Sequence, residues 1–476
     1  MEETKTIFEP RKPMVPDHWR IERFQEAVSL VSDRGKRVKQ SAYLESGKIP
    51  VIDQGQRYIG GYTNDDEMVF EGALPVILFG DHTRSIKYVD KLFAVGAEGI
   101  KILKPKDCFD PKFFYHLLNS LEIPSRGYSR HFQFLNKFYL PIAPLNEQRN
   151  IVAEIEKQFS RLDEAVVSLK RAKVNLKRYK AAVLKAAVEG KLTEQWRKEH
   201  PDIEPTQKLL ERILAERRKK WESAELAKMK AEGRGSKGEK WKKSYKEPNG
   251  PDIEDLPSIP VNWTWATLPQ LGELNRGKSK HRPRNEPKLY GGPYPFIQTG
   301  DIRHSNGVIT KYTQTYSEVG LKQSRLWPKR TLCITIAANI ADTAILGFNA
   351  CFPDSVVGFI PESEYTDVRF TEYFFRTAKK NIEKFAPATA QKNINLDILG
   401  KVAIPLPPEK EQKVIIEEIE RRLSVAEEIE RGIETNMTRT EHFRQSILKK
   451  AFAGELVTRE ISELVDKHTV TYGVMR

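Results

Sequence analysis

The stretches LPIAPLNEQRNIVAEIEKQFSRL (140–162) and IPLPPEKEQKVIIEEIERRLSVA (404–426) stand at matching points in the two halves of the chain. Each begins with a short proline-rich run, passes through Glu-Gln and continues with apolar residues spaced among charged ones. From these points the halves align without a gap, at a constant offset, through Leu192 and Leu456. The chain is therefore internally duplicated, and this repeat governs the prediction of its fold.

An apolar residue recurs every seven positions in both aligned stretches, which is the pattern of a helix that packs along one seam. The seam residues are Ile155, Leu162, Leu169, Leu176 and Val183 in the first copy, and Ile419, Ala426, Ile433 and Ile447 in the second. Pro144 and Pro408 come just before the predicted helices, and Gly190 and Gly454 follow them, as expected at helix ends.

Each helix can run for about 42 residues, or roughly 60 Å at 1.5 Å per residue. A helix of this length with a single apolar stripe needs a partner. We expect the two copies to pack antiparallel against each other, because each leaves a globular segment in the same way. Packing against another protein, or between two copies of the chain, is the alternative.

Further landmarks repeat outside the helices. They are Trp19 in VPDHW and Trp263 in IPVNW, the turns Arg34-Gly35-Lys36 and Arg276-Gly277-Lys278, Pro50-Val51-Ile52 and Pro295-Phe296-Ile297, and the aromatic segments FFYHLL from Phe113 and EYFF from Glu372. The sequences between these landmarks differ strongly. The two globular segments therefore have a common plan but are not expected to present the same surface.

The sequence pattern of both globular segments is typical of α+β domains. Short β-like runs, such as LPVILFG from Leu74, VITKYT from Val308 and TLCITIA from Thr331, lie between Gly, Pro, Asn and Asp turns. One or two helices are expected late in each segment, around residues 111–121 and 369–384. We therefore predict an α+β protein with two globular domains separated by two long antiparallel coiled-coil helices, related by an internal pseudo-twofold repeat.

These patterns divide the chain into seven segments. They are an N-terminal extension (1–15), a first globular domain (16–145), a first long helix (146–190), a helical and Gly/Lys-rich linker (191–257), a second globular domain (258–408), a second long helix (409–454) and a C-terminal tail (455–476). Within the linker, residues 203–226 predict a helix, and residues 227–248 are rich in Gly and Lys. A solvated tether is the favoured interpretation of 227–248, and an arm that follows DNA is the alternative.

The formal net charge is +14 and the isoelectric point is near 9.3. A basic chain favours a polyanionic partner, and the release of counterions makes phosphate the usual one. A basic protein with no such partner is the alternative. The three cysteines, Cys108, Cys333 and Cys351, form no CxxC pair, and no segment has the length or apolarity of a signal peptide or membrane span. We therefore expect a reduced cytoplasmic location and no membrane partner.

Motifs of the expected catalytic classes are missing from the sequence. There is no GxxxxGK[ST] phosphate loop, no GxSxG elbow and no HxxxH or HxH pair for a metal. The one Pro-Pro dipeptide, Pro407-Pro408, precedes Glu409 at a helix start rather than an aromatic residue of a methyltransferase strand. The sequence thus predicts no catalytic residue, no metal ligand and no cofactor in this chain.

The order of these motifs resembles that of type I restriction–modification specificity subunits. The first half supplies GKIPVIDQGQ (47–56), GYTNDD (61–66), LPIAPLNEQ (140–148) and VEGKLTEQWR (188–197); the second supplies NRGKSKHRPRNEPKLYGGPYPFIQTGDI (275–302), ATAQKNINLDIL (388–399), IPLPPEKEQ (404–412) and AFAGELV (451–457). Each motif alone is moderately specific, but the doubled order is highly specific. The resemblance covers nearly the whole chain outside the linker and the last twenty residues.

The resemblance implies two target-recognition domains, each reading one half of a split site in double-stranded DNA. It also implies that the helices bind two methyltransferase (M) subunits, which use S-adenosylmethionine to methylate adenine. Restriction (R) subunits, which use ATP and Mg²⁺ to translocate and cut, would join them. The first half has FGDHTRS where the second has AANIADT, so we expect two different half-sites.

Loops that carry Lys, Arg, Asn, Gln and His are the candidates for DNA contact, since Lys and Arg suit phosphates and the others suit base edges. In the first domain the candidates are Arg34, Lys36, Arg37, Lys39, His82, Arg84, Arg126, Arg130 and His131. In the second they are Arg276, Lys278, Lys280, His281, Arg282, Arg284, Thr299, Arg303, Gln391, Lys392 and Asn393. The alternative for each loop is an exposed basic turn that contacts nothing.

Two other functions remain open from sequence. A two-module coiled-coil adaptor that binds proteins would explain the helices and the duplication but would leave the basic loops unused. An enzyme acting on DNA through an unrecognised site would require a motif that is not visible. The favoured function is a DNA-binding specificity subunit that is not catalytic by itself.

Overall fold

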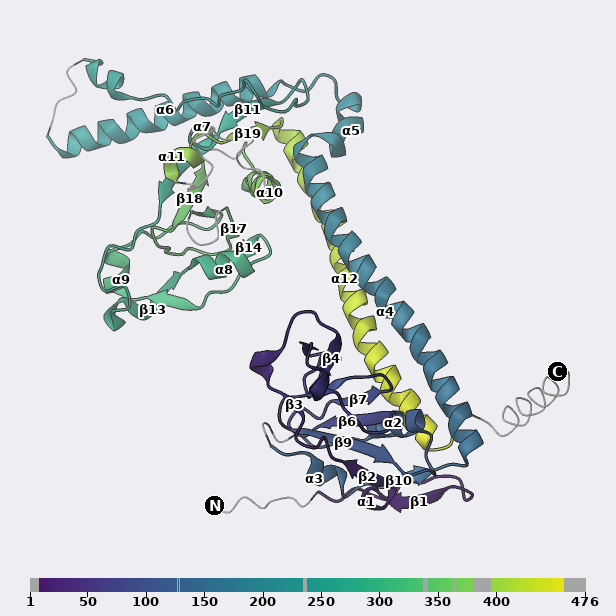
Figure 1. The fold of residues 1–476 in the computed structure, drawn as a ribbon. Coiled ribbons are helices and arrows are strands. Elements are labelled where there is room, and N and C mark those ends of the chain that lie inside the picture. The colour runs from purple at the N-terminus through teal and green to yellow at the C-terminus, as the bar shows by residue number, and fades with distance from the viewer. Residues whose placement is uncertain are drawn as a thin grey trace. The chain divides into compact units, whose positions relative to one another are not determined.

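The computed structural model describes residues 8–125, 127, 129–233, 238–336, 341–362, 365–379 and 395–457 (Figure 1). The chain divides into two compact units, one of Met1–Ala172 with Gly432–Arg476 and the other of Lys173–Arg431. Each unit contains one globular domain and a part of both long helices. The cut falls within both helices, so the seven-segment division predicted from sequence stays a prediction.

The first domain begins and ends on one pair of strands. β1 (Arg20–Arg23) pairs antiparallel with β10 (Tyr139–Ile142), and β10 leads directly into the first long helix. Two four-stranded sheets lie between them, with strand orders β2-β9-β6-β7 and β3-β8-β4-β5. Their strands are Val28–Val31 (β2), Arg37–Val38 (β3), Ile49–Ile52 (β4), Gly61–Thr63 (β5), Val76–Gly80 (β6), Ile86–Val89 (β7), Ala94–Gly96 (β8) and Ile100–Pro105 (β9).

Within its described residues this domain has three α-helices, α1 (Phe24–Ala27), α2 (Pro111–Ser120) and α3 (Phe132–Leu135), and two 3-10 turns, at Gln40–Ala42 and Asp66–Met68. The carboxylate of Asp110 caps α2 by accepting the backbone N–H groups of Lys112 and Phe113. The aromatic residues of α2 pack into a core that also contains Trp19 and Phe452 of the second long helix. Burial of these rings fixes α2 against the end of that helix.

The second domain repeats this plan. β11 (Thr264–Thr267) pairs antiparallel with β19 (Ala403–Leu406), which leads into the second long helix. Its main sheet has the order β12-β18-β16-β17-β14, and β13 pairs with β15. The remaining elements are Leu268–Leu271 (α7), Gly272–Arg276 (β12), Tyr290–Phe296 (β13), Thr299–His304 (α8), Val308–Ile309 (β14), Gln314–Tyr316 (β15), Glu318–Lys322 (α9), Leu332–Thr335 (β16), Thr343–Leu346 (β17), Val356–Pro361 (β18), Val368–Ala378 (α10) and Leu396–Leu399 (α11).

The α+β class and the duplication are confirmed by this order of elements. In both domains a short strand is followed by a one-turn helix (α1, α7), and a later helix (α2, α10) precedes a second one-turn helix (α3, α11) and the closing strand. One strand prediction was too long: only Val308 and Ile309 of VITKYT are a strand. β14 is short because it makes only a two-residue parallel pairing, at the edge of the sheet.

Two long helices follow the domains: α4 (Leu145–Val188) and α12 (Glu409–Phe452), each of 44 residues. In the first unit, Asp163 of α4 forms an ion pair with Arg444 of α12. In the second, Lys180 Nζ lies 2.6 Å from Glu430 Oε2. Later residues of α4 meet earlier residues of α12, so the helices are antiparallel within the chain, as predicted.

The predicted seam residues occupy the less exposed side of each helix. Ile155, Val183, Ile419, Ala426 and Ile433 are buried, and Leu162, Leu169, Leu176 and Ile447 are half-buried. Their neighbours one or two positions away are mostly exposed. The burial of the seam residues agrees with pairing of the two helices within the chain.

The linker is more ordered than its composition predicted. After α5 (Glu194–Glu199) and α6 (Thr206–Ala231), a short 3-10 helix at Lys240–Ser244 packs back on α6. Trp241 stacks on Trp221 with 5.9 Å between ring centroids, and Tyr245 lies 5.2 Å from the same ring. These aromatic residues supply apolar surface that a count of Gly and Lys overlooks, but most of residues 238–248 are exposed, and the interpretation as a solvated tether stays a prediction.

Candidate nucleic-acid interface

The first basic loop joins β2 to β3 and turns at Arg34, whose φ of 53° is left-handed. Arg34 Nη1 and Lys36 Nζ donate to the two carboxylate oxygens of Glu71, at 3.0 and 2.7 Å. Arg37 pairs with Asp33 and also donates to backbone carbonyls. Lys39 is exposed and makes no ion pair with another described residue. Three of the four predicted cations therefore shape the loop, and Lys39 is the one directed to solvent without such a partner.

The turn after β6 brings two predicted stretches together, Asp81–Arg84 and Arg130–His131. The ring Nδ1 of His131 lies 2.9 Å from the carbonyl of Asp81, and the Asp81 carboxylate accepts the N–H of Phe132. His131 is only 1% exposed. The prediction that His131 is a surface contact is wrong, because its ring is packed inside the domain and holds the turn from within.

His82, Arg84 and Arg130 remain candidates around that turn. Arg84 has a left-handed φ of 58° and donates from Nη1 to the carbonyl of Ile123 at 2.8 Å. The side chain of Gln54 accepts the backbone N–H of His82 and donates to the carbonyl of Glu98. Arg130 is exposed. These hydrogen bonds hold the backbone of the turn in one conformation.

In the second domain the basic run Arg276–Arg284 is held at both ends by one residue. Arg276 Nε donates to the backbone carbonyl of Asp354 at 3.0 Å, and Arg284 Nη2 donates to both carboxylate oxygens of Asp354 at 2.8 and 3.1 Å. A Cβ at Gly277 would lie 2.3 Å from the carbonyl oxygen of Pro353, so only glycine allows this close approach.

Between these anchors the loop presents cations to solvent. Lys278 and Lys280 are exposed and make no ion pair with another described residue. Arg282 is exposed but donates to the carbonyls of Ser279 and His281. His281 is half-buried, with its N–H donated to the side chain of Gln323. Lys278 and Lys280 are therefore the best placed of this run for contact with phosphate.

Thr299 and Arg303 lie on α8, whose start is fixed by a capping box between Gln298 and Asp301. Thr313 donates to Asp301, which ties the helix to the following loop. Arg303 is exposed on the last turn. The other four candidates, Arg126, Gln391, Lys392 and Asn393, lie outside the described residues.

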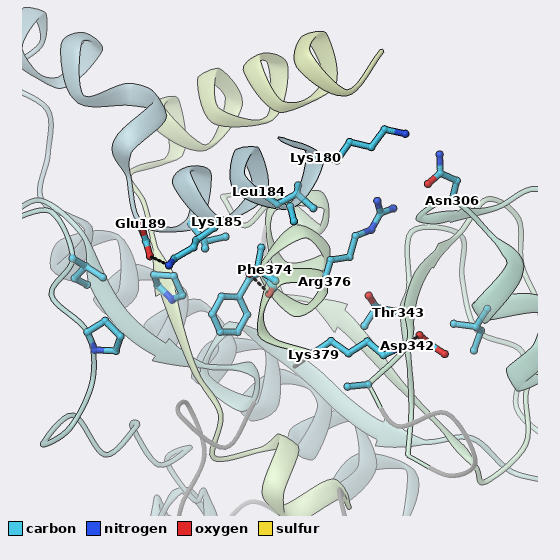
Figure 2. A pocket seen from close by; sticks show the side chains of 18 of the residues that line it. Lys180, Leu184, Lys185, Glu189, Asn306, Asp342, Thr343, Phe374, Arg376 and Lys379 are labelled. Carbon is cyan, nitrogen blue, oxygen red and sulfur yellow. Dashed lines mark hydrogen bonds and ion pairs between the residues drawn. The ribbon is translucent and has the colours of Figure 1, made fainter. Parts of the chain in front are cut away.

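A cleft of about 730 Å³ separates α8 and α10 from the last turns of α4, all within the second unit (Figure 2). Lys180, Leu184 and Lys185 of α4 line one side and Arg376 of α10 lines the other, and Arg303 of α8 is also among the lining residues. The cations are partly neutralised: Arg376 Nε lies 2.6 Å from Glu372 Oε1 and Lys379 pairs with Asp342. Ion pairs therefore hold two of the cations of the cleft wall, Arg376 and Lys379.

Glu372 does not line the cleft itself, but its carboxylate holds Arg376, which does. Glu372 is 2% exposed, and burial raises its pKa to about 7, although Arg376 and the hydroxyl of Thr343 lower it in part. Arg376 lies against Gly307, where a Cβ would be 1.8 Å from its guanidinium. This contact places α10 against the loop that follows α8.

Sequence reasoning missed the acidic anchors Glu71 and Asp354. Each lies tens of residues from the cations that it holds, and no local pattern marks it. No helix of the described residues is long and apolar enough to cross a membrane. Among the same residues, no cluster of three or more His, Cys, Asp or Glu could hold a metal ion.

Comparison with known proteins gives a family. The model of the type I restriction modification DNA specificity domain matches residues 16–173 and 260–439, one match in each half. These matches cover more than half of the chain. The chain belongs to this family.

Curated relatives are similar at low identity. The type I restriction enzyme EcoKI specificity subunit of Escherichia coli K12 is 26% identical over 336 residues, which is 69% of this chain and 60% of that protein. The EcoBI specificity subunit of Escherichia coli is 23% identical over 432 residues, 86% of this chain and 79% of that protein. The match to the first of these thus spans less than two thirds of its length.

Solved structures show a similar fold. The HsdS subunit from Thermoanaerobacter tengcongensis has a TM-score of 0.50 at 15% identity, covering 93% of this chain and 98% of that one. A chain from a structure of complex assembly in a type I restriction–modification system has a TM-score of 0.58 at 16% identity, covering 94% and 100%. At these identities the likeness concerns the fold alone.

Proposed function

We propose that this chain is the DNA-specificity subunit of a type I restriction–modification complex, and that it reads a bipartite, asymmetric site in double-stranded DNA. The observation that carries the proposal is the duplicated domain-plus-helix plan, together with membership in the specificity family. Each domain would read one half-site. No contact among the described residues favours the alternative of a coiled-coil adaptor that binds proteins.

Each domain supplies exposed cations on a loop of fixed shape. In the first, Lys39 and Arg130 are exposed beside the anchored turns; in the second, Lys278, Lys280 and Arg303 are exposed. Phosphate contacts of this kind position a protein on the duplex, and base contacts then specify sequence. Because the anchors differ, Glu71 in one domain and Asp354 in the other, the two loops have different shapes. We infer that the half-sites differ.

The paired helices would act as the spacer between half-sites. Domains that enter grooves on the same side of B-DNA must lie near a whole number of turns apart, about 34–36 Å for one turn. A 44-residue helix is about 66 Å long, which is enough to bridge that distance. The bases between the half-sites would then be ignored, and their number would be fixed.

Catalysis would reside in partners. We propose that two methyltransferase subunits bind this chain and methylate adenine with S-adenosylmethionine, and that restriction subunits use ATP and Mg²⁺. This chain would contribute no catalytic residue. Incubated alone with S-adenosylmethionine, ATP, Mg²⁺ and DNA, it should neither methylate nor cut, whereas label incorporation by the lone chain would support the enzyme alternative.

Copurification with its methyltransferase subunits, followed by methylation mapping on random DNA, tests the proposal. We expect modification at two unlike half-sites with one spacer length. A gel shift at two salt concentrations distinguishes a DNA-binding protein from an adaptor that binds proteins. A protein that binds phosphates loses DNA affinity as salt rises, whereas the adaptor would shift no DNA. Absence of any DNA shift together with absence of site-directed methylation would refute the proposal.

A further inference from the structure

The Glu-Gln pair at the start of each long helix fastens that helix to the preceding domain. In the first unit Gln148 is fully buried. Its Oε1 accepts the backbone N–H of Asp110 at 2.7 Å, and its Nε2 donates to the carbonyls of Cys108 and Ala143 at 2.8 and 2.7 Å. Asp110 is the N-cap of α2, so one amide joins α2, the closing segment and α4.

The second unit repeats the same three bonds. Gln412 is 1% exposed; its Oε1 accepts the N–H of Asp367 at 2.9 Å, and its Nε2 donates to the carbonyls of Tyr365 and Pro407 at 3.1 and 2.9 Å. Asp367 is the N-cap of α10. The residues that supply the accepting carbonyls differ, Cys108 and Ala143 against Tyr365 and Pro407, but the arrangement is the same although the two domains have diverged in sequence.

The glutamate of each pair holds the start of the same domain. Glu147 Oε1 accepts the indole N–H of Trp19 at 3.1 Å, and Glu411 Oε2 accepts that of Trp263 at 2.8 Å. Both tryptophans are buried and immediately precede the first strand, β1 or β11. The two ends of each domain are therefore locked to the first turn of its long helix.

The two junctions differ in how the carboxylate is neutralised. Glu411 is fully buried and also accepts from Thr193 Oγ1 at 2.6 Å and Arg197 Nη1 at 2.5 Å. Glu147 is partly exposed and lies 2.9 Å from His18 Nε2. The position aligned with Thr193 is Val457, so the first junction lacks the hydroxyl that Thr193 donates in the second.

We propose that Glu147-Gln148 and Glu411-Gln412 are positioning residues that set the angle at which each domain leaves its helix, and thereby the one spacer length the protein accepts. This inference rests on the proposed function of the helices as a spacer. Each added base pair rotates one half-site by about a tenth of a turn, so a small change in this angle alters which spacers can be bound. None of the four residues is assigned a contact with DNA.

The test is the spacer preference of the intact complex carrying Gln148→Met or Gln412→Met, which keep the volume but remove the hydrogen bonds. DNA substrates keep both half-sites and vary the spacer by one or two base pairs. We expect methylation at spacers one base pair longer or shorter to rise about tenfold relative to the native spacer, with half-site sequences unchanged. The matched control is Gln158→Met, because the hydrogen bond that Gln158 makes among the described residues stays within α4, to Glu154.

A folded Gln→Met variant that keeps the wild-type preference for one spacer would overturn the inference, as would a change in the half-site sequences. If a Met variant does not fold, Gln148→Asn or Gln412→Asn keeps the amide but shortens its reach, and the same two outcomes decide. If the wild-type complex itself accepts every spacer length, the proposed function fails instead, so the two failures are distinguishable.

Discussion

Two acidic side chains decide which predicted cations are available to a phosphate. Glu71 engages Arg34 and Lys36, and Asp354 engages Arg284. The exposed ion pairs contribute little stability by themselves. Their effect is to hold the loop backbones in one shape and to leave neighbouring lysines as the exposed charges.

Replacing Lys278 and Lys280 together by Ala should weaken DNA binding at every sequence. Each lost phosphate contact makes the slope of log affinity against log salt shallower by about 0.9. Titration of labelled duplex at several salt concentrations measures the slope. The matched double variant Lys228→Ala/Lys230→Ala, on exposed positions of α6, should leave it unchanged; equal slopes for both double variants would contradict the prediction.

Glu372→Gln should flatten the dependence of stability on pH. The pKa of Glu372 is raised from 4.5 to about 7 in the folded chain, so the folded state favours the protonated form. Its contribution to stability is therefore greatest below pH 4.5 and is lost as pH rises through 7. Going from pH 5 to pH 8, wild type should lose roughly 1–3 kcal/mol relative to E372Q.

Thermal unfolding midpoints at pH 5 and pH 8 measure this difference. Exposed Glu428 provides the control, since Glu428→Gln removes a carboxylate from the surface of α12. The prediction is wrong if E372Q and wild type change in parallel over this pH range.

At the scale of elements, the linker packs on α6 through Trp221, Trp241 and Tyr245, a cluster that we call the aromatic clasp. Trp221 contacts Trp241 and Tyr245, and the guanidinium of Arg218 lies 5.7 Å from the Tyr245 ring. Aromatic pairs of this kind contribute about 0.5–1.5 kcal/mol beyond the burial of area. The clasp therefore orders a segment whose Lys content alone would favour solvation.

Trp241→Ala should release this segment without changing the DNA site. We expect trypsin to cleave between Lys240 and Lys246 up to about tenfold faster, because the clasp stabilises the closed segment by up to about 1.5 kcal/mol. Met229→Ala, on α6, is the control. A changed target sequence in methylation mapping would show that the segment reads DNA, contrary to the prediction.

At the scale of the whole molecule, the proposed function assigns the separation of the half-sites to the long helices and the choice of sequence to the domains. Inserting one helical turn near Val174 and a matching turn near Thr438 should demand a longer spacer without altering either half-site, because a turn adds about 5.4 Å to each helix. Methylation mapping of the insertion variant measures the spacer. A domain exchange over residues 16–140 is the companion experiment and should change one half-site only.

An unchanged spacer length in the insertion variant would contradict the proposal that the long helices set the distance between the half-sites. So would a change in both half-sites after exchange of one domain. Bending of DNA can absorb small misfits at a cost of a few kcal/mol, which would broaden the preference rather than leave it fixed.

The sequence by itself determined the duplication, the α+β class and the two long helices. These features follow from local periodicity: an apolar residue at every seventh position, proline before the helix and glycine after it are all properties of neighbouring residues. The predicted helix limits, 146–190 and 409–454, differ from the observed 145–188 and 409–452 only at their ends, where caps and terminal turns blur any boundary.

Only the tertiary structure decided which polar residues face solvent and which hold the domains together. His131 is buried on Asp81, Arg284 is held by Asp354 seventy positions away, and Gln148 and Gln412 join three segments each. A sequence gives the chemistry of such a side chain but not its partner. Burial and hydrogen bonding depend on contacts between distant residues, which exist only once the chain has folded.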